Sequence, residues 1–167
     1  MSNATTERAR GAAILPIRKS IEVARDATTA FRFFTERAGR WWPLETHTIS
    51  SGKPGAKAVA CTFEPRTGGR IYETADDGTE HEWGRILMWE PGKRLVFTWH
   101  LSRAPEQATE VAITFTALGA NRTRVELEHR NWERWGADGP SRRENYDKGW
   151  DLVFNTNYAG YCARTDA

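Results

Sequence analysis

The chain has 167 residues, of which 39% are hydrophobic and 28% are charged, a balance typical of one folded domain rather than of a disordered chain. The net charge is only +2, and acidic residues are interspersed with basic ones, which excludes the continuous basic surface that a nucleic-acid backbone requires. No apolar run approaches the roughly 20 residues that span a bilayer.

The N-terminal part of the chain is predicted to hold a lead and an edge strand. Residues 1–13 are polar and are expected to be disordered, and a single domain is expected over 14–167. Residues 17–23 alternate apolar with polar side chains, which predicts a strand at the edge of a sheet.

Short helices are predicted to follow this strand. Asp26 can cap a helix that begins at Ala27, and Gly39 is expected to end it. The bulky run 41–43 then predicts a corner, and the polar residues 44–57, with their glycines and proline, predict a loop.

Six segments with strand character come next, separated by turn signals. Asp76-Asp77-Gly78 favours a tight hairpin because Gly tolerates a positive φ, and residues 90–93 form another turn signal. Since short turns join the segments, we expect an antiparallel meander. The predicted strands cover 59–64, 70–74, 81–89, 95–100, 111–116 and 123–129.

A long C-terminal helix is predicted to cover one face of this sheet. Ser141 and Glu144 have the spacing of a capping box, so we expect the helix to start there. Side chains at helical spacing form one mainly aromatic stripe, with Phe154 at its margin. The expected class is α+β, with a curled antiparallel sheet around the helix. The stripe consists of Tyr146, Trp150, Val153, Asn157 and Tyr161.

Several motifs resemble a known protein family. The chain is similar, over about residues 15–164, to bacterial proteins related to the activator of the heat-shock chaperone ATPase. These belong to the helix-grip (SRPBCC) superfamily, with steroid-transfer (START) domains, birch-pollen-allergen-like proteins and polyketide cyclases. The resemblance implies a deep cavity between sheet and helix, but no particular chemistry. The motifs are residues 63–73, Glu82-Trp83-Gly84, Trp89-Glu90-Pro91, residues 94–99, Thr109-Glu110-Val111 and residues 123–129.

The aromatic content supports such a cavity. Eight tryptophans, seven phenylalanines and four tyrosines must fill a large core or line a pocket. Ordinary core packing is the alternative for each single ring. The candidate ligand-binding residues are Trp41, Trp42, Tyr72, Trp83, Phe97, Trp99, Phe115, His129, Trp150, Phe154 and Asn157.

Two polar residues are expected among these rings. His129 is in phase with the inward-facing Val125 and Leu127, and Asn157 lies in the helix stripe. A buried polar group left unpaired costs about 1–3 kcal/mol, so each needs a protein, water or ligand partner. One hypothesis is that both orient the polar end of an apolar ligand; the simpler alternative is a structural histidine whose hydrogen bonds are satisfied within the protein.

No catalytic or metal-binding motif is evident. The four histidines are scattered, and Gly68-Gly69 lacks the Lys-Ser/Thr of a phosphate loop. Glu73 and Glu82 could approach each other across a hairpin as an acid–base pair, although solvated strand glutamates are the simpler interpretation. Cys61 and Cys162 match no zinc or redox spacing, which favours buried thiols in a reducing cytoplasm.

The sequence therefore favours a cytoplasmic binding module without cofactor or metal. We expect it to carry, sense or sequester a small hydrophobic or aromatic molecule, as a monomer or homodimer. An enzyme of the polyketide cyclase, dehydratase or hydrolase kind is the alternative, and it would need an inward acid–base pair. A chaperone-cofactor-like interaction domain is the third possibility, and it would need a large exposed apolar patch.

Overall fold

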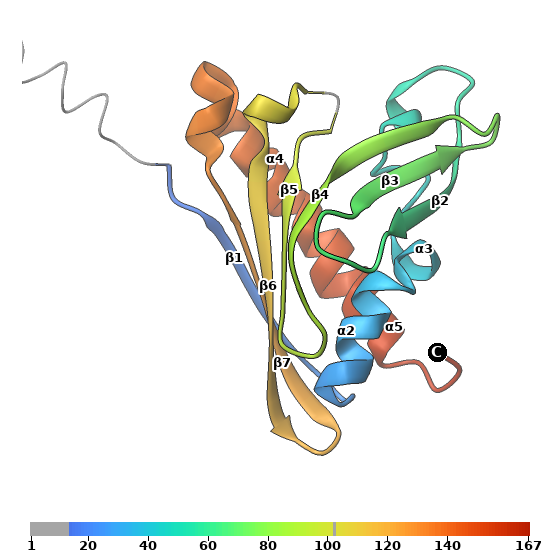
Figure 1. The fold of residues 1–167 in the computed structure, drawn as a ribbon, viewed down its shortest axis with the longest axis vertical. Helices are drawn as coiled ribbons and strands as arrows, with labels where there is room; N and C mark the ends of the chain where they lie inside the picture. Colours follow the sequence, from blue (N-terminus) through green and yellow to red (C-terminus); the bar gives the residue numbers. More distant parts are fainter. Residues whose placement is uncertain (1–13, 102) are drawn as a thin grey trace, which may run out of the picture.

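The computed structural model describes residues 14–101 and 103–167, so the lead predicted over 1–13 lies outside the described residues. Its elements follow the predicted order of strand, two short helices, six strands and long C-terminal helix (Figure 1). The strands are β1 (Ile17–Val23), β2 (Ala58–Phe63), β3 (Arg70–Ala75), β4 (Glu80–Glu90), β5 (Arg94–Trp99), β6 (Thr109–Gly119) and β7 (Arg122–Arg130).

All seven strands form one antiparallel sheet in the order β1-β7-β6-β5-β4-β3-β2. The first strand therefore pairs with the last, with Ile17 opposite His129, and it is an edge strand as predicted. Alternating side chains place Val111, Ile113 and Leu127 on the buried face. This face is curled around the C-terminal helix, which confirms the predicted α+β class (Figure 1).

The helices lie on the concave side of the sheet and at its ends (Figure 1). The C-terminal helix is continuous, but its middle third is π-helical. The α-helices are α2 (Ala27–Thr35), α3 (Ala38–Trp41), α4 (Gly139–Trp150) and α5 (Ala159–Cys162). The π-helical segment is η4 (Asp151–Tyr158), and the 3₁₀ turns are η1 (Ser50–Gly52), η2 (Pro105–Gln107) and η3 (Trp132–Asp138).

Two predicted helix boundaries are wrong. Gly39 does not end the first helix, because α2 already ends at Thr35 and Gly39 lies within α3. A Cβ at Gly39 would lie 3.5 Å from the Cys61 carbonyl oxygen, an ordinary contact, so α3 packs against β2 here without requiring a glycine.

The capping box predicted at Ser141 is also absent. The helix begins two residues earlier at Gly139, and the Ser141 hydroxyl donates to the Asp138 carbonyl oxygen at 3.1 Å. Pro140 in the first turn has the φ that a helix start needs. A Cβ at Gly139 would lie 2.6 Å from the Trp132 carbonyl oxygen, so tertiary contact places the start where only glycine fits.

The π-helical segment changes which helical residues face the sheet. A π-helix has a wider turn than an α-helix, which shifts a stripe expected from α-helical spacing. Phe154, expected at the margin, is fully buried, and so is Tyr158, which was not in the predicted stripe. Their rings stack with centroids 5.7 Å apart. Asn157 is only partly buried.

Among the described residues, no helix combines the length and apolar character needed to cross a lipid bilayer.

Candidate functional site

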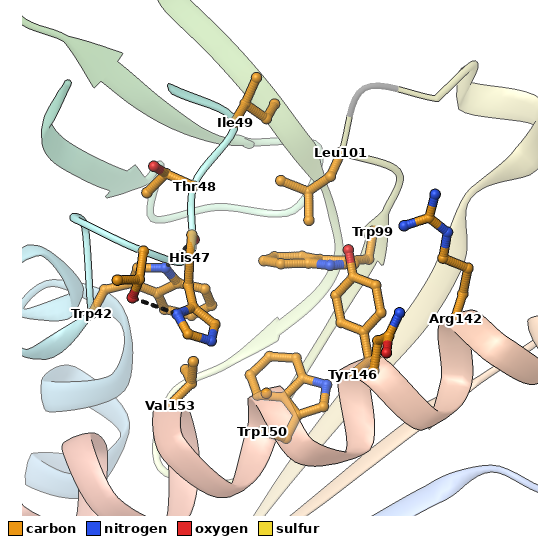
Figure 2. A pocket seen from close by; sticks show the side chains of 13 residues that line it. Trp42, His47, Thr48, Ile49, Trp99, Leu101, Arg142, Tyr146, Trp150 and Val153 are labelled. Atoms are coloured by element: carbon orange, nitrogen blue, oxygen red, sulfur yellow. Dashed lines mark hydrogen bonds between the residues drawn. The ribbon is translucent and has the colours of Figure 1, made fainter. Parts of the chain in front are cut away.

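A cavity of about 410 Å³ lies between α4, the end of β5 and the loop that precedes β2 (Figure 2). Aromatic and aliphatic side chains form about half of its wall, and polar side chains come from the loop and from the first turns of α4. Its lining consists of Trp42, Thr46, His47, Thr48, Ile49, Trp99, Leu101, Arg142, Asn145, Tyr146, Gly149, Trp150 and Val153.

Three tryptophans from different elements form the inner wall of this tryptophan-walled cavity. The ring centroids of Trp42 and Trp99 lie 5.9 Å apart, and that of Trp150 is 6.0 Å from each of them. Trp83 supports them from behind, 4.9 Å from Trp42 and 5.5 Å from Trp99. The wall thus offers flat π-surfaces to a ligand.

A chain of hydrogen bonds around His129 fixes two of these tryptophans. The indole N–H of Trp150 bonds to His129 Nδ1 at 3.0 Å, and His129 Nε2 lies 2.7 Å from Thr109 Oγ1. The Thr109 hydroxyl donates to the Trp99 carbonyl oxygen at 3.0 Å. Burial holds the pKa of His129 well below its usual value of 6.5, so the ring is neutral.

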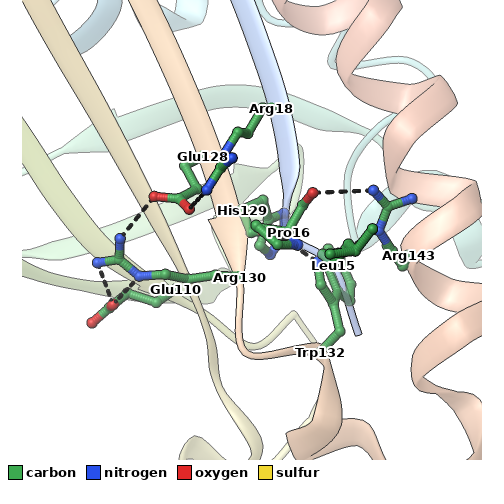
Figure 3. A network of polar contacts seen from close by, with 9 residues as sticks. All are labelled: Leu15, Pro16, Arg18, Glu110, Glu128, His129, Arg130, Trp132 and Arg143. Carbon is green, nitrogen blue, oxygen red and sulfur yellow. Dashed lines mark hydrogen bonds and ion pairs between the residues drawn. The ribbon is translucent and has the colours of Figure 1, made fainter. Parts of the chain in front are cut away.

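The backbone of His129 is equally well paired. Its carbonyl oxygen accepts from the indole N–H of Trp132 at 2.9 Å (Figure 3). On the opposite face of the sheet the next residue, Arg130, forms ion pairs with Glu110 and Glu128 at 2.6 and 3.1 Å (Figure 3). The end of β7 is thus fixed on both faces beside the cavity.

The loop over the cavity is attached to the sheet by one buried carboxylate. Glu73 on β3 accepts hydrogen bonds from the amides of Ile49 and Ser50, at 2.5 and 2.9 Å, and from the Trp83 indole at 2.7 Å. Burial opposes its ionisation, but these bonds outweigh that effect and hold its pKa below the usual value. Glu73 is therefore an ionised anchor for the loop.

His47 is the titratable group that this loop brings to the cavity. Its Nδ1 lies 2.7 Å from Thr46 Oγ1 (Figure 2), and its backbone carbonyl accepts from the Trp42 indole at 2.9 Å. Its Nε2 faces Gly149, where an added Cβ would lie 3.9 Å away. Burial lowers its pKa below 6.5, which favours a neutral ring with a nitrogen available to a bound molecule.

The structure brings together three of the candidate ligand-binding residues, Trp42, Trp99 and Trp150. The other candidates do not line the cavity. Trp41, Trp83, Phe97, Phe115 and Phe154 are packed in the core.

The two polar candidates use their side chains within the protein. His129 is fully buried on the inner face, as its phase with Val125 predicted, and both of its nitrogens are paired. The side-chain amide of Asn157 donates to the Trp41 carbonyl oxygen at 3.0 Å. Tyr72 lies on the opposite face of β3 from Glu73, with the Arg70 guanidinium 4.3 Å from its ring centroid.

Several residues that line the cavity could not be identified as candidates from the sequence. Residues 46–49 carry no periodic signal, because they belong to an irregular loop that is placed over the helix by bonds from distant residues such as Glu73. Arg142 and Asn145 precede or flank the predicted stripe in a region without an apolar pattern. Tyr146 was expected in the stripe but was not proposed as a ligand contact.

The other polar candidates do not form a second site. Glu73 and Glu82 do not pair: Glu82 contacts Arg85 and His100 at 2.7 and 3.1 Å. The prediction that Glu73 is a solvated strand residue is wrong, because its carboxylate is fully buried. Over residues 14–101 and 103–167, no three His, Cys, Asp or Glu side chains are grouped as metal ligands.

Cys61 and Cys162 are free and buried, as predicted. Burial, with the Glu73 charge nearby, raises the pKa of Cys61 to about 12, and burial raises that of Cys162 to about 11. Both thiols are therefore packing groups and not nucleophiles.

A curled antiparallel sheet around one long helix, with an aromatic cavity between them, defines a helix-grip protein. The chain belongs to the family described as activator of Hsp90 ATPase homolog 1-like proteins, whose sequence profile matches residues 25–157. No curated protein matches the chain significantly.

Solved structures of similar proteins agree with this assignment. An anthrahydroquino-gamma-pyrone synthase, Txn09, is 34% identical with a TM-score of 0.62, over 89% of this chain and 97% of that one. The self-sacrificing resistance protein CalC from Micromonospora echinospora is 31% identical with a TM-score of 0.65, over 89% and 94%. An HSP90 activator from Plasmodium falciparum shares the fold at 18% identity and a TM-score of 0.58, over 86% and 93%.

Proposed function

We propose that the protein binds a small, flat aromatic or hydrophobic molecule in the tryptophan-walled cavity, as a carrier, sensor or sequestering protein. The observation that carries this proposal is the wall of Trp42, Trp99 and Trp150, whose rings pack against one another and together line one side of the cavity. A volume of about 410 Å³ falls within the range of small-molecule sites, which are mostly apolar with few polar groups.

One of the two relatives above 30% identity supports an aromatic molecule as the ligand class. Txn09 is a synthase of an anthrahydroquino-gamma-pyrone, a fused aromatic system, and CalC is a resistance protein. The wall suits such a molecule because stacked or edge-on rings attract each other in addition to burying apolar area.

The test is a thermal-shift and tryptophan-quenching screen with polycyclic quinones and phenols. A ligand that binds only the folded protein raises Tm, by a stabilisation of about 2.7 kcal/mol at one hundred times its Kd. We expect hits from flat tricyclic molecules, with binding weakened at least tenfold in Trp42→Ala by loss of a stacking surface. Trp89→Ala is the matched control, because Trp89 does not line the cavity. An equal loss of ligand affinity in Trp42→Ala and Trp89→Ala, or a screen without hits, would contradict the proposal.

A second candidate function is catalysis in the same cavity, and His47 is the observation that favours it. A neutral histidine with one nitrogen held by Thr46 and the other facing the cavity is suited to accept a proton from a bound phenol or activated C–H group. The 34% identity to a synthase supports this reading.

Catalysis is distinguished from binding by product analysis. Molecules that bind are incubated with wild type and with His47→Gln, and products are followed by mass spectrometry. Catalysis requires a product that wild type forms and the variant forms at least one hundred times more slowly, at unchanged affinity. Ligands recovered unaltered from wild type leave binding as the function.

A further inference from the structure

The indole of Trp99 differs from the other buried indoles, because its N–H lies beside the Tyr146 hydroxyl but makes no hydrogen bond of good geometry. Trp99 is 2% exposed and lines the cavity, yet its Nε1 is unpaired among the described residues. An unpaired buried donor costs about 1–3 kcal/mol, so a partner from outside the chain would stabilise it. Six of the eight indoles donate to an internal acceptor: Trp41, Trp42, Trp83, Trp132, Trp135 and Trp150.

More donors gather around this indole. Figure 2 shows the Tyr146 hydroxyl and the Arg142 guanidinium at the same end of the cavity, next to the Trp99 ring. Burial raises the pKa of Tyr146, while the Trp99 indole beside it and the charges of Arg142 and Arg103 act in the opposite direction. The Tyr146 phenol is therefore protonated at neutral pH and keeps a proton to donate.

Acceptors are scarce at this end. None of the residues that line the cavity is an Asp or Glu, and Arg142 forms no ion pair with any residue the structure describes. Arg103 already has partners within the protein: it forms an ion pair with Asp138 at 3.5 Å, and its guanidinium lies 4.4 Å from the ring centroid of Trp135. The Asn145 amide on the same helix and the Tyr146 hydroxyl each supply both a donor and an acceptor, but neither carries a negative charge.

We propose that this donor cluster, formed by Trp99, Tyr146 and Arg142, binds an ionised oxygen of the ligand, so that the protein selects acidic aromatic molecules carrying a phenolate or carboxylate. The inference rests on the proposed function and adds the chemical class and the orientation of the ligand. The aromatic body stacks within the tryptophan wall, and its charged oxygen lies towards Arg142. Hydrogen bonds to a charged group are about twice as strong as neutral ones, so charge and not shape decides the preference.

Two probes of matched shape test this inference: anthraquinone-2-carboxylate and anthraquinone-2-carboxamide. Both affinities are measured by tryptophan quenching at low ionic strength. Wild type is expected to bind the carboxylate about tenfold more tightly than the carboxamide. Arg142→Gln should reduce this preference to within about threefold, mainly by lowering the affinity for the carboxylate probe. Lys148→Gln, which removes a charge from the same helix outside the cavity, should retain it.

A further variant separates the indole donor from the ring. Trp99→Phe keeps an aromatic surface and removes the N–H. It should lower the affinity for the carboxylate probe about three- to tenfold. Equal wild-type affinity for the two probes would overturn the inference while leaving the proposed function intact. A preference that survives in Arg142→Gln would overturn it as well. Binding of neither probe would overturn the proposed function together with this inference.

Discussion

The indole N–H of Trp150 donates to Nδ1 of His129, and this one bond determines where the ring of a fully buried histidine carries its proton. Since Nδ1 accepts, the proton must be on Nε2, which donates to Thr109 Oγ1. The Thr109 hydroxyl is then free to donate to the Trp99 carbonyl. One tautomer thus links the helix and strand tryptophans that pack against each other in the cavity wall.

Replacing His129 should lower the stability of the fold, although His129 does not line the cavity. His129→Leu leaves the Trp150 indole without its acceptor and removes the donor to Thr109, at a cost of about 1–3 kcal/mol in the free energy of unfolding. Urea denaturation measures the loss. His81→Leu, at a half-buried position outside the core, is the control and should change stability by less than about 0.5 kcal/mol. Equal stability of the two variants would show that the network contributes little.

The same histidine should make stability sensitive to mild acid. Its pKa in the folded state lies well below the unfolded value of 6.5, so the unfolded chain binds the proton more readily. The contribution of neutral His129 to the free energy of unfolding is fully present above pH 6.5. It should decrease as the pH drops below 6.5, by up to about 1.4 kcal/mol per pH unit.

Comparing unfolding curves of wild type and His129→Leu between pH 7.5 and 5.5 isolates this residue. The difference between them should shrink as pH falls, because the variant lacks the titrating group. His47, whose pKa burial also lowers, contributes in the same direction to both proteins and cancels. A difference that is constant with pH would contradict a depressed pKa for His129.

The Glu73 anchor should control the loop as well as stability. Glu73→Gln replaces one acceptor oxygen by an NH₂ group that must face an amide donor, so at least one of the bonds to Ile49 and Ser50 is lost. We expect a loss of about 1–3 kcal/mol and faster hydrogen exchange at these two amides. Glu80→Gln, an exposed partner of Arg70, is the matched control. Unchanged exchange in Glu73→Gln would mean that the loop is held by other contacts.

Gly149 provides a way to fill the cavity without disturbing its wall. A Cβ there would make only ordinary contact with His47, at 3.8 Å, so Gly149→Ala should fold and gain up to about 1 kcal/mol in helix propensity. Gly149→Leu should project further into the cavity and abolish ligand binding. Gly160, whose added Cβ would meet nothing within 4 Å, is the control: Gly160→Leu should bind normally. Calorimetry and the quenching assay report the two effects, and full affinity in Gly149→Leu would place the ligand elsewhere.

Much of the fold could be predicted because its determinants are local. The alternation of apolar and polar side chains in residues 17–23 and 123–129 identified two strands and their buried faces. It also predicted that His129 lies on the buried face. The helix start could not be predicted in this way, since Gly139 is required by a contact with the Trp132 backbone across an intervening turn. The π-helical turns could not be predicted either, because the sequence of residues 151–158 has no pattern that distinguishes a π-helix from an α-helix.

The site was less predictable than the fold. Tryptophans are recognisable as wall candidates, but whether a ring faces open space or another ring depends on packing, as Trp42 and Trp41 show. Glu73 has the strand phase of an inward residue, yet a carboxylate is expected inside only if donors meet it there. Those donors are backbone amides of a distant loop, which have no signature in the side-chain sequence.

The tryptophan wall also has a consequence for the entropy of association. An indole has only two side-chain torsions, and internal hydrogen bonds already restrain those of Trp42 and Trp150. A guest whose shape fits this wall would therefore find a preorganised surface and lose little binding free energy to the ordering of side chains. A guest of equal volume but another shape would gain nothing from adaptation by this wall, so the rigidity of the indoles itself selects for shape.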